Sequence, residues 1–109
     1  MLLNKQVQNL LGLAERAKQL AYGENVVQAI RKGKAVLVLY ASDASQNTQK
    51  MITDKSAYYQ VEAIMVDDSQ LLSSCVGKSG RMAVAILDHG FARKIKEKLG
   101  VGESDGKNE

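Results

Sequence analysis

The sequence predicts an α/β fold in which one sheet lies between layers of helices. Three apolar runs of strand-forming residues, at 35–40, 60–66 and 82–87, show no regular alternation of polar and apolar positions. Such runs are typical of strands that are covered on both faces. The segments between them carry apolar residues at helical spacing, and this alternation of helices and strands favours a largely parallel sheet with helical crossovers.

Length and composition set the class of protein. A chain of 109 residues is long enough for one domain with its own core, and 45% of its residues are apolar, which is typical of a globular protein. No apolar run approaches the roughly 20 residues of a membrane span, so we expect no membrane partner. Cys75 is the only cysteine and cannot form an internal disulfide, which favours a reducing compartment and a cytoplasmic location.

The charge is unevenly placed along the chain. The net charge is +3, but the last ten residues hold mostly acidic side chains: Glu103, Asp105 and Glu109 against Lys107. Without that segment, the 15 basic residues become 14 and the 12 acidic residues become 9, so residues 1–99 carry +5. We expect 1–99 to form a single domain and 100–109 to be a disordered polar tail, because the tail has no apolar periodicity. A modestly basic domain points weakly to a polyanionic partner.

The first elements lead to a glycine turn. Residues 3–17 place leucine, valine and alanine at helical spacing, which predicts an amphipathic helix of about four turns. Residues 20–22 are expected to form a very short strand. Gly23 then supplies the backbone conformation that a tight turn needs.

The stretch 22–34, YGENVVQAIRKGK, predicts a short helix with an exposed start. Glu24 or Asn25 can cap or charge this start, and Gly33 ends the helix. The free N–H groups at a helix start attract anions, phosphate above all. The alternative is an ordinary capped helix with a solvated end, which is the commoner case for such a stretch taken alone. An apolar stripe at helical spacing turns the helix toward the core through Val26, Val27 and Ile30.

The later elements follow from the same patterns. Further helices are expected over 45–57, from Asp67 or Ser69 to Cys75, and from Asp88, which caps it, to Leu99. Residues 76–81 form a loop before the last apolar run, with Gly77 and Gly80 as its hinges.

Gly77-Lys78-Ser79 resembles part of a nucleotide-binding phosphate loop, but that motif needs a glycine where Leu72 stands. The segment also precedes a strand, whereas the phosphate loop follows a strand and opens a helix. We therefore exclude a nucleotide-hydrolysing loop, and interpret Lys78 and Arg81 as solvated or phosphate-contacting cations.

No residue cluster predicts catalysis or a metal site. Cys75 and His89 lack a third orienting group, and one Cys with one His falls short of the usual ligands of a zinc site. Asp43, which follows the first apolar run, is the best single carboxylate for catalysis, but a helix cap is the simpler interpretation because no second group is visibly paired with it. We therefore expect no enzyme, no metal and no cofactor, which favours a binding function.

One known family combines these features. The run YGENVVQAIRKGKAVLVLYASDAS, the TDK at 53–55 and the run LLSSCVGKSGRMAVAIL together resemble the kink-turn RNA-binding family of ribosomal proteins L-seven-Ae and L-thirty-e, and most of all its small bacterial YlxQ-type members. The resemblance covers roughly 10–99, and the order of elements agrees throughout. It implies a three-layer α-β-α sandwich with a mixed four-stranded sheet.

The resemblance also implies an RNA-binding helix start. In the family, a G-x-N-E pattern opens the second helix and contacts the sheared G·A pairs of a kink-turn. Counting from either end of the helix places Asn25 in this pair, with Val26 beside it in one register and Glu24 in the other. The lysine that is usual one turn later becomes Gln28 or Ala29. The contact residues implied for this segment are Gly23, Glu24, Asn25, Val26 and Gln28.

A second contact is implied by the apolar loop with which the family covers an extruded base. This loop matches Ser74, Cys75, Val76 and Gly77. The cations that the resemblance places around one surface, where they would hold phosphates, are Lys34, Lys78 and Arg81.

The sequence therefore predicts a non-enzymatic, cytoplasmic and monomeric protein that binds kink-turn-like structured RNA, on the ribosome or apart from it. Phosphate contacts would supply most of the affinity and base contacts the specificity. Two alternatives stay open: a protein-interaction adaptor of a ribosome or RNA-processing complex, and a small enzymatic or ligand-binding domain that uses Asp43 and Asp88 at the strand ends.

Overall fold

The computed structural model describes residues 2–100, so the predicted tail lies, apart from Gly100, outside the described residues. Within the described range the helices and strands have ends that differ by no more than two residues from those that apolar periodicity predicts. In chain order they are α1 (Lys5–Arg16), β1 (Leu20–Tyr22), α2 (Glu24–Arg31), β2 (Leu37–Ala41), α3 (Gln46–Tyr58), β3 (Glu62–Val66), α4 (Ser69–Cys75), β4 (Ala83–Ile86) and α5 (His89–Leu99).

The sheet is mixed. Its strand order is β1-β4-β2-β3, with β2 and β3 parallel and β4 antiparallel to both of its neighbours. The expectation of a largely parallel sheet was wrong, because α4 has only 7 residues and is too short to carry the chain back along the sheet. β4 therefore begins at the end of the sheet where β3 finishes. The mixed four-stranded sheet that the resemblance implied is confirmed.

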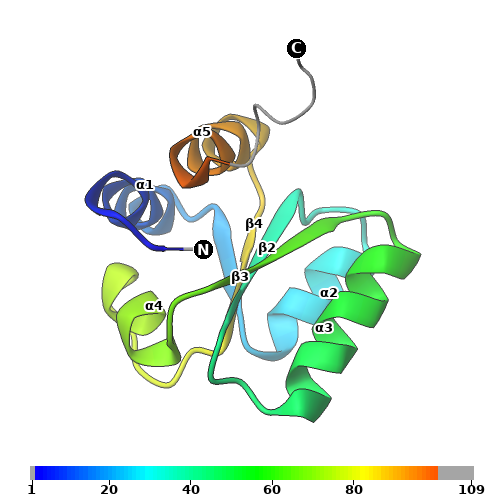
Figure 1. Ribbon diagram of the computed structural model, residues 1–109. Helices are drawn as coiled ribbons and strands as arrows, with labels where there is room; N and C mark the ends of the chain where they lie inside the picture. The colour runs from blue at the N-terminus through cyan, green and yellow to red at the C-terminus, as the bar shows by residue number, and fades with distance from the viewer. Residues whose placement is uncertain (1, 101–109) are drawn as a thin grey trace.

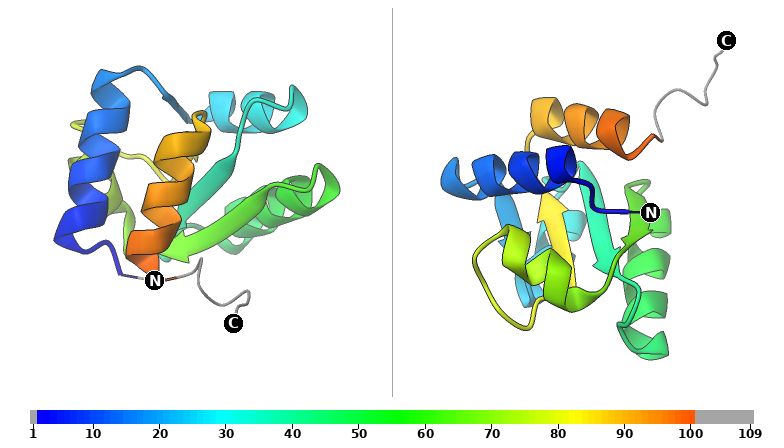
Figure 2. Two further views of the ribbon diagram at one scale, coloured as in Figure 1. Left: turned by 90° about the horizontal axis from the view of Figure 1, so that it is seen from above. Right: turned by 60° about the vertical axis from the view of Figure 1, so that its left-hand side comes forward.

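Helices cover both faces of this sheet. α2 and α3 lie on one face, and α1, α4 and α5 lie on the other (Figures 1 and 2). Alternate residues of β2 divide the core between the two sides: Val38 and Tyr40 pack toward α2 and α3, whereas Leu37 and Leu39 pack toward the other three helices. Every residue of β2 is buried, as the unbroken apolar run predicted. The three-layer sandwich is thus confirmed.

β3 is less buried than its sequence indicated. It lies at the edge of the sheet and pairs only with β2, so its side chains are covered unevenly. Ile64 and Val66 are buried, but Glu62 is exposed and Met65 is 40% exposed. Glu62 pairs with Lys96 of α5 at 2.6 Å, which keeps a charge on the edge.

Side-chain caps fix the starts of four of the five described helices. The side chain of Asp88 accepts a hydrogen bond from the Phe91 N–H at 2.9 Å, as predicted. Asp68, rather than either of its neighbours, caps α4. The other two capped helices are α1, by Asn4, and α3, by Ser45. α2 is the exception.

Candidate nucleic-acid interface

The start of α2 is open to solvent and carries no side-chain cap. Gly23 occupies the cap position with a φ of 56°, in the region that favours glycine, and has no side chain to offer. The prediction that Glu24 or Asn25 caps the helix was wrong, because both already belong to its first turn. Both side chains are exposed, and neither forms a hydrogen bond with another described residue. The first amides of α2 and two polar side chains are therefore left for a partner.

The orientation of α2 separates the two possible registers of the family motif. Val26 is fully buried between α2 and the sheet, so its side chain does not reach the surface. Glu24 and Asn25 both lie in solvent, which favours the register that pairs them. Gln28 is also exposed and lies one turn beyond Glu24.

The apolar loop that was expected beside this helix is largely not a loop. Ser74 and Cys75 belong to the last turn of α4, and Val76 is only 3% exposed because it packs in the core beneath α1. Cys75 is half-buried, and burial, with a smaller contribution from the charge of Asp67, raises the pKa of its thiol. The true loop is polar and begins at Gly77.

Buried Ser73 holds both ends of this loop. Its carbonyl accepts a hydrogen bond from the Lys78 N–H at 3.1 Å, and its hydroxyl oxygen accepts one from the Arg81 N–H at 2.8 Å. Gly77 and Gly80 adopt φ angles of 69° and 68°, so both predicted hinges lie in the region that favours glycine. The loop is therefore a tight, fixed connection that presents its two cations in defined places.

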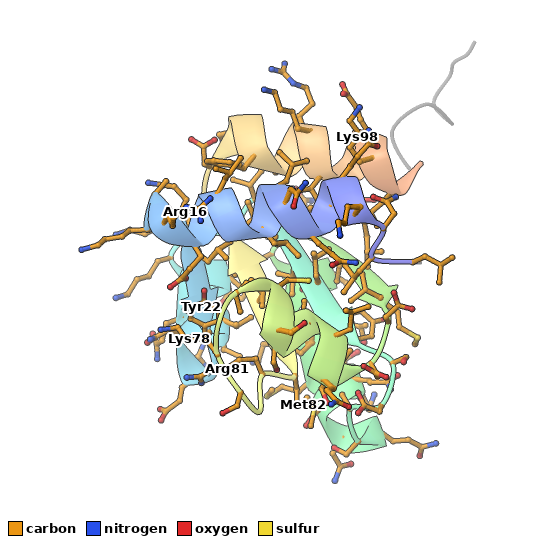
Figure 3. The ribbon with its side chains drawn as sticks, turned by 90° about the vertical axis from the view of Figure 1, so that its left-hand side faces the viewer. Arg16, Tyr22, Lys78, Arg81, Met82 and Lys98 are labelled. Carbon is orange, nitrogen blue, oxygen red and sulfur yellow. The ribbon has the colours of Figure 1, made fainter. Side chains whose placement is uncertain are left out.

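The cations of the loop, Lys78 and Arg81, both lie beside Tyr22 (Figure 3). The guanidinium carbon of Arg81 lies 5.4 Å from the centre of the Tyr22 ring, and Nζ of Lys78 lies 5.7 Å from it. The Tyr22 hydroxyl donates a hydrogen bond to Glu15, whose other carboxylate oxygen is 3.7 Å from Nζ of Lys78. Burial, together with Glu15, raises the pKa of Tyr22 well above its usual range, although Arg81 acts in the opposite direction. The ring thus stays neutral and supports a cation–π arrangement.

Arg81 links the loop to the start of α2. A methyl group added to Gly23 would lie 3.7 Å from Nη1 of Arg81, so the guanidinium reaches the backbone at the helix start. Nε of Arg81 is buried and has no hydrogen-bond partner among the described residues. The two segments that the resemblance assigned to RNA therefore do meet in space.

A pocket opens between these two segments and α3. Its volume is about 470 Å³. The apolar part of its wall comes from Val27, Met51 and Met82, and the two methionines are 43% and 40% exposed. Polar groups around it include Glu24, Gln28, Thr48 and Arg81. The apolar surface expected from 74–77 is thus supplied here by α2, α3 and the residue just before β4.

Lys34 lies apart from this group. It follows the C-terminal end of α2, and the 8 residues of that helix separate it from Gly23 by about 12 Å along the axis. The expectation that Lys34 shares one surface with Lys78 and Arg81 stays a prediction. Conversely, sequence reasoning missed four residues that build the site, because no local pattern marks them: Glu15, Tyr22, Met51 and Met82.

The carboxylates considered for catalysis have structural partners. Asp43 accepts hydrogen bonds from the N–H and the hydroxyl of Ser69 at 2.8 and 2.9 Å, and these bonds lower its pKa. Asp88 caps α5. Among residues 2–100, no group of three or more His, Cys, Asp or Glu side chains is arranged to hold a metal ion, and no helix is long and apolar enough to cross a membrane.

A sandwich of this topology, with its free helix start beside a basic loop, matches one family of proteins. Residues 5–96 match the model of the Ribosomal protein L7Ae/L30e/S12e/Gadd45 family. The chain belongs to this family, which confirms the resemblance seen in the sequence.

Individual relatives agree. The chain is 46% identical over 87 residues to the RNA-binding protein YlxQ of Bacillus subtilis (strain 168), covering 79% of this chain and 87% of the relative. It is 43% identical over 94 residues to the RNA-binding protein YlxQ of Enterococcus faecium, covering 85% and 90% respectively.

Solved structures show the same fold. A Bacillus halodurans protein described as having unknown function superposes with a TM-score of 0.85 at 38% identity, over 89% of this chain and 99% of its own. The Giardia lamblia 15.5kD RNA binding protein superposes with a TM-score of 0.72 over 91% of this chain and 86% of its own. At 19% identity, this second likeness concerns the fold alone.

Proposed function

We propose that this protein is a non-enzymatic, cytoplasmic RNA-binding protein that recognises kink-turn-like structured RNA as a monomer. The observation that carries the proposal is the uncapped start of α2, where Asn25 and Glu24 stand free beside two cations fixed on one aromatic ring. The names of the YlxQ relatives support an RNA partner.

The shape of RNA limits how such a site works. The major groove of an A-form duplex is too deep and narrow for side chains to read. The start of a helix reaches base edges only where the duplex is bent or its pairs are non-standard. Sheared G·A pairs at a sharp kink provide both conditions, and α2 offers an uncapped end to enter there.

Each part of the site has a distinct role. The Asn25 amide both donates and accepts hydrogen bonds, so it can pair with two positions of a purine edge, and the Glu24 carboxylate accepts from amino or imino groups. Lys78 and Arg81 bind phosphates through their charged ends. These charges supply affinity, while the α2 side chains supply selectivity.

The pocket receives an extruded base. Its volume of about 470 Å³ is large enough for a nucleobase, and a thioether from Met51 or Met82 packs well against an aromatic ring. Polar neighbours such as Gln28 and Thr48 can bond the edge of the base. In this proposal the pocket residues cover the extruded base, in place of Cys75 and Val76, to which the sequence analysis assigned that contact.

Electrophoretic mobility shifts at fixed salt test the proposal. The RNAs are a kink-turn, the same RNA with its G·A pairs replaced by Watson–Crick pairs, and a plain duplex of equal length. We expect clear preference for the intact kink-turn. Equal affinity for all three RNAs would contradict the proposal.

A further inference from the structure

The positive charge of the folded chain is concentrated on one outer layer. Residues 1–99 hold 14 basic and 9 acidic side chains. Seven of these residues, six basic and only Glu97 acidic, lie exposed on α1, on α5 or just after α1 and make no ion pair with a described residue. The remaining 8 basic and 8 acidic residues cancel, so the whole +5 belongs to this layer. We call the six cations the basic face: Lys5, Arg16, Lys18, Arg93, Lys94 and Lys98.

Internal pairs have already neutralised the other charges of these two helices. Lys96 of α5 pairs with Glu62 at 2.6 Å. Glu15 of α1 accepts a hydrogen bond from Tyr22 and pairs with Lys78. Among residues 2–100, Glu97 is therefore the one acidic side chain of α1 and α5 that is left without an ion pair.

The two helices present these cations as one surface. α1 and α5 lie side by side and run antiparallel, since the Asn4 amide donates to the Lys98 carbonyl at 2.8 Å (Figure 2). Arg16 and Lys98 mark opposite ends of the face in Figure 3. With the 12 residues of α1, the face is about 18 Å long. It lies across the sheet from α2 and α3.

Lys98 lies in the last turn of α5, where a cation suits the helix dipole, but it also repels Lys94. Lys94 and Lys98 are four residues apart, and like charges at this spacing destabilise a helix. A row of anions laid along the helix would remove the repulsion. A face made of lysine and arginine side chains suits the phosphate backbone, whose contacts carry no sequence information.

One end of the basic face adjoins the candidate site. Arg16 follows Glu15, which contacts both Tyr22 and Lys78. Figure 3 shows Arg16 at the same end of the molecule as Tyr22 and Lys78. An RNA stem that leaves the site at this end would therefore run along α1 and α5.

We propose that the basic face is a second RNA contact, which binds the phosphate backbone of a double-helical stem extending from the site. This inference rests on the proposed function and extends it, because it states which second part of the RNA, the stem, contacts the protein. The face strengthens binding as the stem lengthens, until the stem spans the face, and it reads no sequence. Selectivity for the kink stays with α2.

The test uses the full chain and three RNAs: a kink-turn with short stems, the same kink-turn with one long stem, and a long plain duplex. The variant is Arg93→Gln/Lys94→Gln/Lys98→Gln. The matched control, Arg31→Gln/Lys32→Gln/Lys50→Gln, removes the same charge from the α2–α3 side. Circular dichroism checks that both are folded.

For the wild type we expect tighter binding to the long-stemmed RNA than to the short-stemmed one, and a steeper dependence on salt. The α5 variant should lose that gain, and its salt slope on the long RNAs should fall by about two to three units, at roughly 0.9 per phosphate as for duplex DNA. The control should keep the gain.

Two results would overturn the inference. Either the α5 variant keeps the wild-type gain and slope, as it would if the chain's own acidic tail or a protein occupied the face, or the control loses as much. Failure of the proposed function is seen separately: the wild type would then bind the short-stemmed kink-turn no more tightly than a plain duplex of equal length. In that case the long plain duplex still reports whether the basic face binds RNA.

Discussion

Tyr22 presents its ring to Lys78 and Arg81 and its hydroxyl to Glu15, so a single side chain joins α1, β1 and the loop. Each cation–π contact at an exposed site contributes about 0.5–1 kcal/mol. The ring also fixes where the two charges point, and in the proposed function this reduces the ordering cost of binding RNA.

Tyr22→Leu should therefore weaken kink-turn binding several-fold, because both cations lose their contact with the ring. A loss of about 1.4 kcal/mol corresponds to a tenfold change in affinity. Tyr22→Phe keeps the ring, loses only the bond to Glu15, and should bind much nearer to the wild type. Dissociation constants of the three proteins decide the matter, with the Arg81 Nε–H signal in NMR spectra as a readout in the free protein. A Phe variant as weak as the Leu variant would show that the hydroxyl, and not the ring, positions the loop.

Asp43 gives a residue-scale prediction for stability. Its hydrogen bonds to Ser69 lower its pKa below 3.8, so the folded state favours the charged carboxylate. That stability is present above the ordinary pKa and is lost as the pH falls through the lowered value. Asp43→Asn should thus lower the urea midpoint at neutral pH, and the difference should shrink below pH 3.8. RNA binding should not change. A loss of RNA binding with stability intact would contradict the structural role.

At the level of helices and strands, the sequence analysis assigned the cover of an extruded base to one loop before β4. In the structure, the residues around this loop lie in two different places. Val76 ends α4 inside the core, and Met82 stands at the mouth of the pocket just before β4. The first side chain is part of the core, and the second is proposed to contact RNA.

Val76→Ala should lower the free energy of unfolding by about 1–3 kcal/mol, the cost of deleting buried methyl groups, without changing the preference for a kink-turn over a duplex. Met82→Ala should change stability by less than about 0.5 kcal/mol, as at surface sites, but speed RNA dissociation. Chemical denaturation and surface plasmon resonance measure the two effects. If Val76→Ala speeds RNA dissociation and Met82→Ala lowers stability instead, the extruded base is covered by the end of α4 and not by the pocket.

At the scale of the whole molecule, local patterns predicted the elements well because burial dictates periodicity. The apolar run of β2 has both faces covered, and Asp88 caps α5 where expected. Pairing was harder: the similar apolar run that contains β3 occupies an edge, since strand order depends on contacts between distant segments. The sequence alone does not tell a central strand from an edge strand when both read as apolar.

The candidate site shows the same limit. Asn25 could be proposed from the sequence because its own helix carries the pattern. Tyr22 and Glu15 could not, because their roles arise only when α1, β1 and the loop meet. Val26 shows the opposite error: motif counting admitted it, and its burial in the core removes it from the surface.

The most direct test of the proposed readout compares the ratio of kink-turn to plain-duplex affinity, at fixed salt, for the wild type and Asn25→Ala. Asn9→Ala, an exposed asparagine on α1, is the matched control. Asn25→Ala should remove about 1–3 kcal/mol of discrimination, the range for two-bond base contacts in DNA, while duplex binding hardly moves. Asn9→Ala should leave the ratio as it is. If Asn25→Ala also leaves the ratio unchanged, the start of α2 is only a solvated helix end, and the proposed readout is contradicted.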